Sequence, residues 1–547
     1  QATGIYGGDS GDLVTAAATF GIPHPPGYPL YTFLGWLLTH LPLATPAWRV
    51  GLLSTLPHAA TLTLVYLLVY RATRKVIPAL FAAVALLGNY LFFLYGTTVE
   101  VFALFDFFII SLVYLFWRFS ETRNHNYLLG ASFVFGLALS HHQVILFMLP
   151  GVFYWLWRHY KSFRKSRTPL FIFALILGLL PYLYIPIAAR GGAIINWDRP
   201  VDWANFVRLV TRADYGTFVS SGFYGALLSQ RLLSLKAYGQ FLFIDLTLWG
   251  LILSAAGLIW LWRKQRQFLL FWLILLTFLG PGFFFYASFP LMNRFTLGTY
   301  ERFLLPSYIL LYPLVGLGLT QVIDTWRKLA GRLLPHAAKT SALILPLVLS
   351  LYPLATFGVN LWRFNGLRED RTAENLASDI LMSVPPESIL FLVRDTPLFT
   401  TQYQRYAQGV RPDVIVLHTH RLVTRDYPQV LRRVFPQLAI PEKTGEDFPL
   451  EFIKANREKR PIFSNSELPL DRGWYWVPHG LVYRLTPERD LPAAPQMLSL
   501  NRSLWERYHN PQSGILSRYP HLMLSDVADV YAASRVSLGK TLLRAGE

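Results

Sequence analysis

The stretch TPLFIFALILGLLPYLYIPIAA, residues 168–189, decides the fold of this chain. It contains no charged side chain, and roughly 20 apolar residues suffice to cross a bilayer as a helix. Basic residues precede it directly, at Arg164, Lys165 and Arg167. Because short loops rich in lysine and arginine stay in the cytoplasm, the stretch predicts a membrane span that begins on the cytoplasmic side.

Similar apolar stretches recur as far as about residue 360 and predict a polytopic α-helical membrane protein. The helices of a large globular core would carry polar faces, which these stretches lack. Beyond residue 361 charged residues become frequent, which predicts a soluble C-terminal part. We expect spans at 49–70, 76–95, 100–117, 126–140, 143–157, 168–189, 239–262, 268–289, 302–322 and 341–360.

The composition fits a membrane protein better than a nucleic-acid-binding one. Of the 547 residues, 53% are hydrophobic and 16% are aromatic, and the formal net charge is +18. The basic side chains concentrate in short connections between the apolar stretches, as topology signals do. We therefore expect the lipid bilayer as a partner and no nucleic acid. The chain has no cysteine, which excludes disulfides and thiolate metal sites.

The basic connections also predict which side of the membrane each loop faces. By the positive-inside rule, the connections at 71–75, 118–123, 158–167, 263–266 and 327–339 are cytoplasmic. The intervening connections then lie outside, together with the opening loop and everything after residue 361. The apolar stretch 30–41 is too short to span, so we expect an amphipathic or re-entrant helix against the outer leaflet. We also expect a first span that precedes Gln1 and is missing from this sequence.

The residues after 361 predict a small α/β domain, because strand-like apolar runs alternate with helical patterns. Strands are expected at 388–393, 414–417 and 474–485, and helices at 400–407, 427–435 and 526–544. No nucleotide-binding motif is present, so an energised donor would come from elsewhere, for instance the membrane. The expected domains are an outer loop with an acidic motif and an interfacial helix (1–48), a transmembrane domain (49–360) that includes the outer loop 190–238, an extracytoplasmic α/β domain (361–490) and a helical tail (491–547).

The opening loop carries two carboxylates, Asp9 and Asp12, among glycines. Three residues apart, both would point the same way on a helical turn. A carboxylate at the mouth of a low-dielectric cavity is suited to act as a general base. The structural alternative is a helix cap, in which Asp9 or Ser10 caps a helix expected at 13–19 and Asp12 is favoured in its first turn. The two roles are compatible.

Further polar residues fall on the same outer face. His24 and Tyr28 lie in a turn stiffened by prolines, Glu100 begins a span, and His141 and His142 lie where two spans meet. The alternatives are a plain loop for the turn, an interfacial anchor for Glu100 and a helical turn for the paired histidines. No spaced third metal ligand accompanies those histidines, so we expect contact with substrate or phosphate before metal.

The outer connections also hold arginine and aromatic residues that topology does not explain. Guanidinium groups recognise phosphate oxygens bidentately, and tryptophan and tyrosine offer large amphipathic faces. Salt bridges with neighbouring carboxylates are the alternative for each arginine. Together these side chains predict an anionic ligand at the membrane surface. They are Arg190, Trp197, Asp198, Arg212, Tyr215, Glu301 and Arg302.

The motif GGDSGD at residues 7–12, followed by GIPHPPGYPLY at 21–31, resembles the transmembrane protein 260-type protein O-mannosyltransferases and their bacterial relatives. Supporting motifs are TVEVFA at 98–103, LSHH at 139–142, NWD at 196–198, TRADYG at 211–216 and ERF at 301–303. The resemblance runs through most of the chain and is most specific before residue 306.

This resemblance implies a type-C glycosyltransferase (GT-C) fold and the chemistry that belongs to it. The protein would move a sugar, expected to be mannose, from a polyprenyl-phosphate donor to an acceptor hydroxyl, expected to be a protein serine or threonine. By position, Asp9 would be the base and Asp12 its partner, although the family often has glutamate at the second position. Phosphate would be held by Arg190, Arg212 or Arg302, and by His24 or His142.

The resemblance implies no cofactor, because the lipid-linked sugar is a substrate. A metal-dependent transferase, with Asp9, Asp12 and a histidine as ligands of a divalent cation, is an alternative that we do not favour. We expect an integral protein of the bacterial inner membrane with a periplasmic active site, or of the endoplasmic reticulum with a luminal site if the chain is eukaryotic. One rival interpretation is a lipid-linked-sugar flippase or transporter, which would show internal repeats with broken helices that the sequence does not reveal. Another is a non-catalytic membrane receptor, in which the acidic loop is only a cap.

Overall fold

The structure is a computed structural model that describes residues 1–160, 167–216, 227–333 and 338–544. Lys161, Arg164 and Lys165 of the predicted cytoplasmic loop, and part of the outer loop 190–238, lie outside the described residues. The chain divides into two compact units. We call residues 52–182 and 214–365 the helical unit, and residues 1–51, 183–213 and 366–547 the sheet unit.

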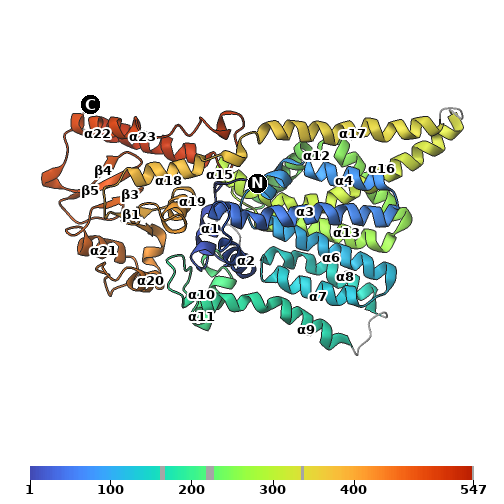
Figure 1. Cartoon of the computed structure of the whole chain (residues 1–547), viewed down its shortest axis with the longest axis horizontal. Coiled ribbons are helices and arrows are strands. Elements are labelled where there is room, and N and C mark those ends of the chain that lie inside the picture. The colour runs from blue at the N-terminus through green and yellow to red at the C-terminus, as the bar shows by residue number, and fades with distance from the viewer. Residues whose placement is uncertain (161–166, 217–226, 334–337, 545–547) are drawn as a thin grey trace. The chain divides into compact units, whose positions relative to one another are not determined.

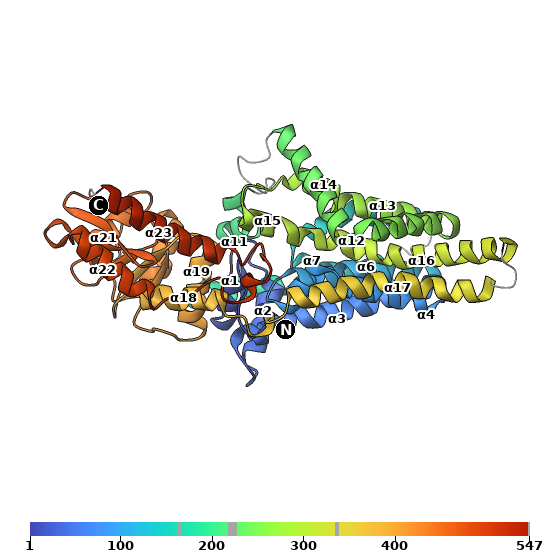
Figure 2. The same cartoon turned by 90° about the horizontal axis from the view of Figure 1, so that it is seen from above.

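The apolar helices confirm the predicted polytopic α-helical membrane fold. Among the described residues, seven helices are long and apolar enough to cross a membrane. An eighth span results if α4 (Val76–Leu87) and α5 (Tyr90–Thr97), which meet at a bend of 67°, count as one. Figure 2 shows the long helices of the helical unit running side by side as a bundle. The seven are Pro46–Thr73, Phe102–Thr122, Thr168–Ala189, Leu228–Lys264, Arg266–Ala287, Arg294–Arg332 and Ile344–Met382.

Two of the ten predicted spans correspond to shorter elements. The stretch 126–140 forms α7 (Asn126–Leu139), whose 14 residues reach only about 21 Å of the roughly 30 Å hydrocarbon core. The stretch 143–157 is divided into a 3-10 helix (Gln143–Met148) and α8 (Leu149–Arg158). Pro150 lies in the first turn of α8, where its missing N–H cannot continue the preceding hydrogen bonds.

The helices α12 (Leu228–Lys264) and α16 (Leu305–Leu333) pack backbone against backbone. A Cβ on Gly318 would lie 1.8 Å from the carbonyl oxygen of Leu253, so only glycine fits there. Small residues allow such close van der Waals packing between membrane helices. The other elements of this part of the chain are α3 (Pro46–Thr73), α6 (Phe102–Thr122), α9 (Thr168–Leu179), η4 (Leu180–Leu183), α13 (Arg266–Leu279), α14 (Pro281–Ala287), α15 (Arg294–Glu301), η6 (Arg302–Leu304) and α17 (Ala338–Arg363).

The sheet unit is built on five strands in the order β2-β1-β3-β5-β4. β1 (Ile389–Leu392) lies parallel to both β2 (Ile415–His418) and β3 (Ile462–Ser464). β5 (Val482–Pro487) is antiparallel to β3 and forms a hairpin with β4 (Trp474–His479). Figure 1 shows α22 (Ala494–Trp505) and α23 (Asp526–Arg544) on one side of the sheet, and α20 (Tyr427–Val434) and α21 (Phe448–Asn456) on the other.

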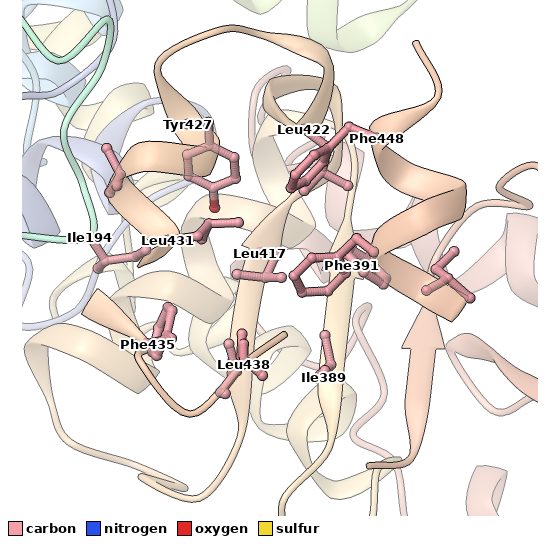
Figure 3. Packing of buried hydrophobic residues seen from close by; sticks show 14 of the residues in the cluster. Ile194, Ile389, Phe391, Leu417, Leu422, Tyr427, Leu431, Phe435, Leu438 and Phe448 are labelled. Carbon is pink, nitrogen blue, oxygen red and sulfur yellow. The ribbon is translucent and has the colours of Figure 1, made fainter. Parts of the chain in front are cut away.

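Segments far apart in the sequence share the core of the sheet unit. Phe391 of β1 and Leu417 of β2 pack in one buried cluster with Ala16 and Ile194, and Figure 3 shows Ile194 beside the helix and strand residues. The acidic loop and the stretch 183–213 are therefore parts of this unit. Its other elements are α1 (Ser10–Ala18), α2 (Pro29–Thr39), α10 (Tyr184–Ala189), α11 (Trp203–Val210), η5 (Ala213–Tyr215), η7 (Leu367–Glu369), α18 (Thr372–Met382), α19 (Asp395–Gln402), η8 (Tyr403–Ala407), η9 (Thr419–Val423), η10 (Glu488–Asp490) and η11 (Ile515–Ser517).

The secondary structure predicted for the soluble part is largely confirmed. Strands occupy the three predicted stretches, and the third of them is the hairpin of β4 and β5. The predicted helix 526–544 is α23, with the same bounds. The short apolar stretch 30–41 forms a helix, α2, as predicted, and its contact with the outer leaflet stays a prediction. The three-residue strand β3 was not predicted.

Candidate active site

Asp9 and Asp12 converge on one side chain, that of His24. Asp12 is completely buried, and its Oδ2 accepts hydrogen bonds from the backbone N–H of His24 at 2.9 Å and from Nδ1 at 2.8 Å. Asp9 remains partly exposed, and its Oδ2 lies 3.8 Å from Nε2 of the same ring. The imidazole therefore stands between a buried carboxylate and an accessible one.

The alternative role of Asp9 as a side-chain cap is wrong. Asp9 occupies the N-cap position of α1, but its side chain makes no capping hydrogen bond. Asp12 lies in the first turn of α1, as expected for an acidic residue near a helix N-terminus. The carboxylate of Asp9 is thus directed to the side of His24 and not to the amides of its own helix.

Aromatic side chains enclose His24. Phe399 of α19 stacks on its ring at 6.4 Å, and Tyr28 and Trp197 approach edge-on at 5.3 Å and 6.5 Å. The turn between His24 and Tyr28 contains Gly27 with φ of +82°, a conformation that favours glycine. This packing fixes the orientation of the imidazole toward both carboxylates.

The charges around His24 determine its pKa. Burial alone would lower the pKa of the imidazole, but the charge of Asp9, the hydrogen bond that the ring donates to Asp12 and the nearby Asp395 outweigh it and raise the pKa above its ordinary value. His24 is therefore disposed to carry a proton beside these carboxylates. In that form both ring nitrogens are donors, and both face carboxylates, so they are less available to a separate phosphate than the sequence implied.

The acidic loop lies at the carboxyl edge of the parallel strands. β1 leads through Arg394 into α19, whose first residue, Asp395, acts electrostatically on His24. α1 packs directly on α19, because a Cβ on Gly11 would lie 2.4 Å from the carbonyl oxygen of Phe399. In open α/β sheets this edge is the usual place for a ligand.

The second strand adds residues that sequence reasoning missed. The ring of Trp197 lies 5.2 Å from that of His418, the last residue of β2, and beneath the guanidinium of Arg421 at 5.0 Å. Arg421 also donates to the carbonyl of Asn196 at 2.8 Å and pairs with Asp426. Burial, with Arg421 and a neighbouring histidine, lowers the pKa of His418 well below its ordinary value. The position of His418 at a strand end was the available signal.

The other predicted residues of the outer loop have mainly local partners. Arg190 is exposed and donates to the carbonyls of Pro186 and Val201 at 3.0 and 3.4 Å. Asp198 is buried, 3.8 Å from Nε of Arg208, which fits the salt-bridge alternative. Arg212 is half-buried and Tyr215 is exposed.

The predicted residues of the helical unit gather where α5 meets α6. Glu100 is buried and accepts a hydrogen bond from Arg302 at 3.0 Å. The guanidinium of Arg302 lies over the ring of Phe102 at 5.5 Å. Ser54 holds the junction by accepting from the amide of Glu100 and donating to its carbonyl, at 3.2 and 3.1 Å. Glu100 is thus a member of a buried ion pair and not a simple interfacial anchor.

The paired histidines and Glu301 line the same junction. Nε2 of His141 is 2.8 Å from the carbonyl oxygen of Val101, and His142 stacks on Phe105 at 4.8 Å. Glu301 accepts a hydrogen bond from the hydroxyl of Tyr95 at 3.3 Å. Within the described ranges, no group of three or more His, Cys, Asp or Glu side chains has the geometry to hold a metal ion.

Comparison with known families extends these observations. Residues 9–165 match the model of the protein O-mannosyl-transferase TMEM260 N-terminal domain. The protein O-mannosyl-transferase tmem260 of Dictyostelium discoideum is 24% identical over 96% of this chain and 70% of its own length. The mouse (Mus musculus) TMEM260 is 29% identical over 80% of this chain and 63% of its own length. The chain thus covers about two thirds of these relatives.

A solved structure shares the fold. The crystal structure of ArnT from Cupriavidus metallidurans, bound to undecaprenyl phosphate, superposes with a TM-score of 0.56 and 12% identity over 88% of this chain and 93% of that one. At this identity the likeness concerns the fold alone. It confirms the GT-C-like architecture that the sequence motifs predicted.

Proposed function

We propose that this chain, a relative of the TMEM260-type protein O-mannosyl-transferases, transfers a sugar from a polyprenyl-phosphate donor to an acceptor hydroxyl. The broad class, a membrane glycosyltransferase, agrees with the names of its relatives and with its fold. We infer mannose as the sugar, and protein serine or threonine as the acceptor, from the activity in the relatives' names. A polyprenyl-phosphate donor is supported by the lipid that the solved ArnT binds.

The mechanism depends on different roles for Asp9 and Asp12. Asp12 is buried and its Oδ2 is committed to His24, whereas Asp9 is the carboxylate that a substrate reaches. Asp9 accepts the proton of the acceptor hydroxyl while that oxygen attacks the anomeric carbon. The bond from the anomeric carbon to the phosphate oxygen breaks, and the polyprenyl phosphate leaves with the electron pair. Asp12 fixes the position of the His24 ring, and His24 in turn fixes the position of the Asp9 carboxylate.

The phosphate that leaves carries negative charge, which a cationic side chain would stabilise. Arginine side chains stabilise such charge by paired hydrogen bonds. Arg190 and Arg212 of the sheet unit and Arg302 of the helical unit remain the candidates, and substitution of each would rank them. Arg302 differs from the others because a buried carboxylate, Glu100, already neutralises it. The active site would face the periplasm, or the lumen of the endoplasmic reticulum in a eukaryote.

The test compares two isosteric variants in a transfer assay. Purified protein is incubated with polyprenyl-phosphate mannose and serine- or threonine-containing peptides, and the products are measured by mass spectrometry. Asp9→Asn should lower transfer at least about 100-fold, because general bases contribute about 10²- to 10⁴-fold. Asp12→Asn should lower it less. Donor binding should survive in both.

The matched control is Asp490→Asn, since Asp490 is an exposed carboxylate of the same unit and should leave transfer unchanged. Wild-type transfer by the Asp9→Asn protein would show that another group accepts the proton. If Asp12→Asn were the more damaging variant at equal stability, the two roles would be exchanged.

We further infer that the reaction needs no resident metal. Oδ2 of Asp12 is occupied by two hydrogen bonds from His24, which makes the pair a poor start for a coordination sphere. Transfer should be unchanged after treatment with EDTA and dialysis. Loss of transfer that Mg²⁺ or Mn²⁺ restores would contradict this inference.

A further inference from the structure

A cavity of about 220 Å³ opens in the helical unit, between helices that cross the membrane. Its wall combines a carboxylate on α12, Asp245, with a guanidinium at the end of α17, Arg363. Both are costly in a membrane unless they have a role. The full lining is Gly88, Tyr90, Ile244, Asp245, Tyr312, Ala355, Thr356, Val359, Asn360 and Arg363.

One interruption of helical backbone lies in the wall of this cavity and a second lies close to it in sequence. Gly88, in its wall, lies at the bend between α4 and α5. Thr247, two residues from Asp245, has φ of +57° and ψ of 175° inside α12. A β-branched residue rarely adopts such a backbone conformation, and outliers of this kind often mark functional positions. Within a membrane, irregular backbone is tolerated where it is buried or lines a cavity, as at the binding sites of broken helices.

Hydrogen bonds hold the charged groups in place. The hydroxyl of Tyr308 donates to Oδ2 of Asp245. Asn360 donates to the carbonyl of Gly88 at 2.6 Å and accepts from Arg363 at 3.3 Å. A separate bond, from the hydroxyl of Tyr352 to the carbonyl of Leu246 at 2.5 Å, supports the break in α12. Hydrogen bonds therefore fix the charged side chains of the cavity, which carry opposite charges on α12 and α17.

The surroundings of the cavity fit an amphiphile. Phe243, Ile244 and Leu248 of α12 are more than half exposed, and so are Leu351 and Leu354 of α17. Such side chains flank the polar wall with apolar surface suited to acyl chains.

The depth of the cavity fits a headgroup. From the break at Thr247, α12 runs about 26 Å at 1.5 Å per residue to its basic end at Lys264, close to the thickness of a hydrocarbon core. The cavity then lies at the level of the outer headgroups.

We propose that this cavity binds the headgroup of a zwitterionic aminophospholipid, with its ammonium group at Asp245 and its phosphodiester at Arg363. The volume is below the roughly 300–1,000 Å³ of sites for drug-sized ligands, which suits a headgroup with its chains left outside. A primary ammonium donates hydrogen bonds to a carboxylate, and a guanidinium matches phosphate oxygens. The proposal does not depend on the transfer reaction.

The test uses the full-length protein, freed of lipid in detergent and then given equimolar phosphatidylethanolamine and phosphatidylglycerol. Native mass spectrometry measures which lipid remains bound. The wild type should retain phosphatidylethanolamine at least about tenfold over phosphatidylglycerol, because an ammonium–carboxylate hydrogen bond is worth about 1.5–3 kcal/mol. Asp245→Asn should abolish this preference, and Arg363→Gln should weaken the binding of both lipids.

Matched controls are Asp324→Asn and Arg266→Gln, which change the same groups elsewhere in the helical unit. Both should retain the lipid preference of the wild type. Equal retention of the two lipids by the wild type would overturn the proposal, whether or not the variants fold. Displacement of the retained lipid by a polyprenyl-phosphate sugar would also overturn it, because the cavity would then belong to the donor.

Discussion

His24 differs from an ordinary surface histidine because three carboxylates act on it at once. Asp12 receives its Nδ1–H, Asp9 faces its Nε2, and Asp395 adds a longer-range field. The sequence predicted that Asp9, Asp12 and His24 belong to one site, but not that the histidine links the carboxylates. That linkage depends on the turn from His24 to Tyr28, whose direction no local pattern specifies.

The raised pKa of His24 predicts a dependence of stability on pH. A group whose pKa is higher in the folded state contributes stability that is fully present below its unfolded value, about 6.5. The contribution is lost as the pH rises through the folded value. The melting temperature of the wild type should therefore exceed that of His24→Gln by more at pH 6 than at pH 9.

The control for this measurement is His40→Gln, because His40 is exposed and its Nδ1 pairs with the carbonyl of Trp36 in the preceding helix, not with a carboxylate. It should show no such trend. A wild-type advantage over His24→Gln that stays constant or grows with pH would mean that the imidazolium does not stabilise the fold.

Among the elements, α1 and α19 can pack closely because α1 has a glycine at their contact. Gly11 lies inside α1, where alanine would ordinarily favour the helix by about 1 kcal/mol. Here the added Cβ would fall 2.4 Å from a carbonyl oxygen of α19, so the two helices must separate. Gly11→Ala should lower both the melting temperature and transfer.

Gly239→Ala is the corresponding control, since nothing lies within 4 Å of its added Cβ. Transfer should match the wild type, and the melting temperature should equal or exceed that of the wild type. If Gly11→Ala behaved like this control, α1 would not depend on close contact with α19, and the acidic loop would be held by other elements.

The elements also show where sequence patterns succeed and where they fail. The strands β1 and β2 and the helix α23 follow hydrophobic periodicity, and their positions were predicted. The break between α4 and α5 was not, because the apolar stretch 76–95 runs through it without a charge. Arg421 and His418 were missed for another reason: their contacts with Trp197 join residues more than 200 positions apart.

On the scale of the whole molecule, the sheet unit is assembled from three separated segments of chain. Local patterns assign the acidic loop and the C-terminal residues to different domains, because tertiary contacts leave no periodic signal. The shared core places Ala16 and Ile194 against the strands. Removal of those segments would expose apolar surface of the size that promotes aggregation.

Residues 361–547 alone should therefore not behave as a stable domain. We expect this fragment, made separately, to be degraded by limited proteolysis under conditions in which the same residues of the full-length protein resist it. Co-production with residues 1–360 should restore the resistance, because the missing parts of the core return. A protease-resistant, monomeric fragment with a cooperative melting transition would contradict this expectation.

The close packing of α1 on α19 determines when, during synthesis, the acidic loop makes its final contacts. The segment 1–51 leaves the ribosome before the segment that begins at 366, which follows more than 300 residues later. At about 5–20 residues per second, the acidic loop waits roughly 15–60 seconds for its partner. During that interval the loop that carries Asp9 has no α19 to hold it. A chain interrupted before α19 would be a harmless product, because the proposed base is held in place only after α19 has been made.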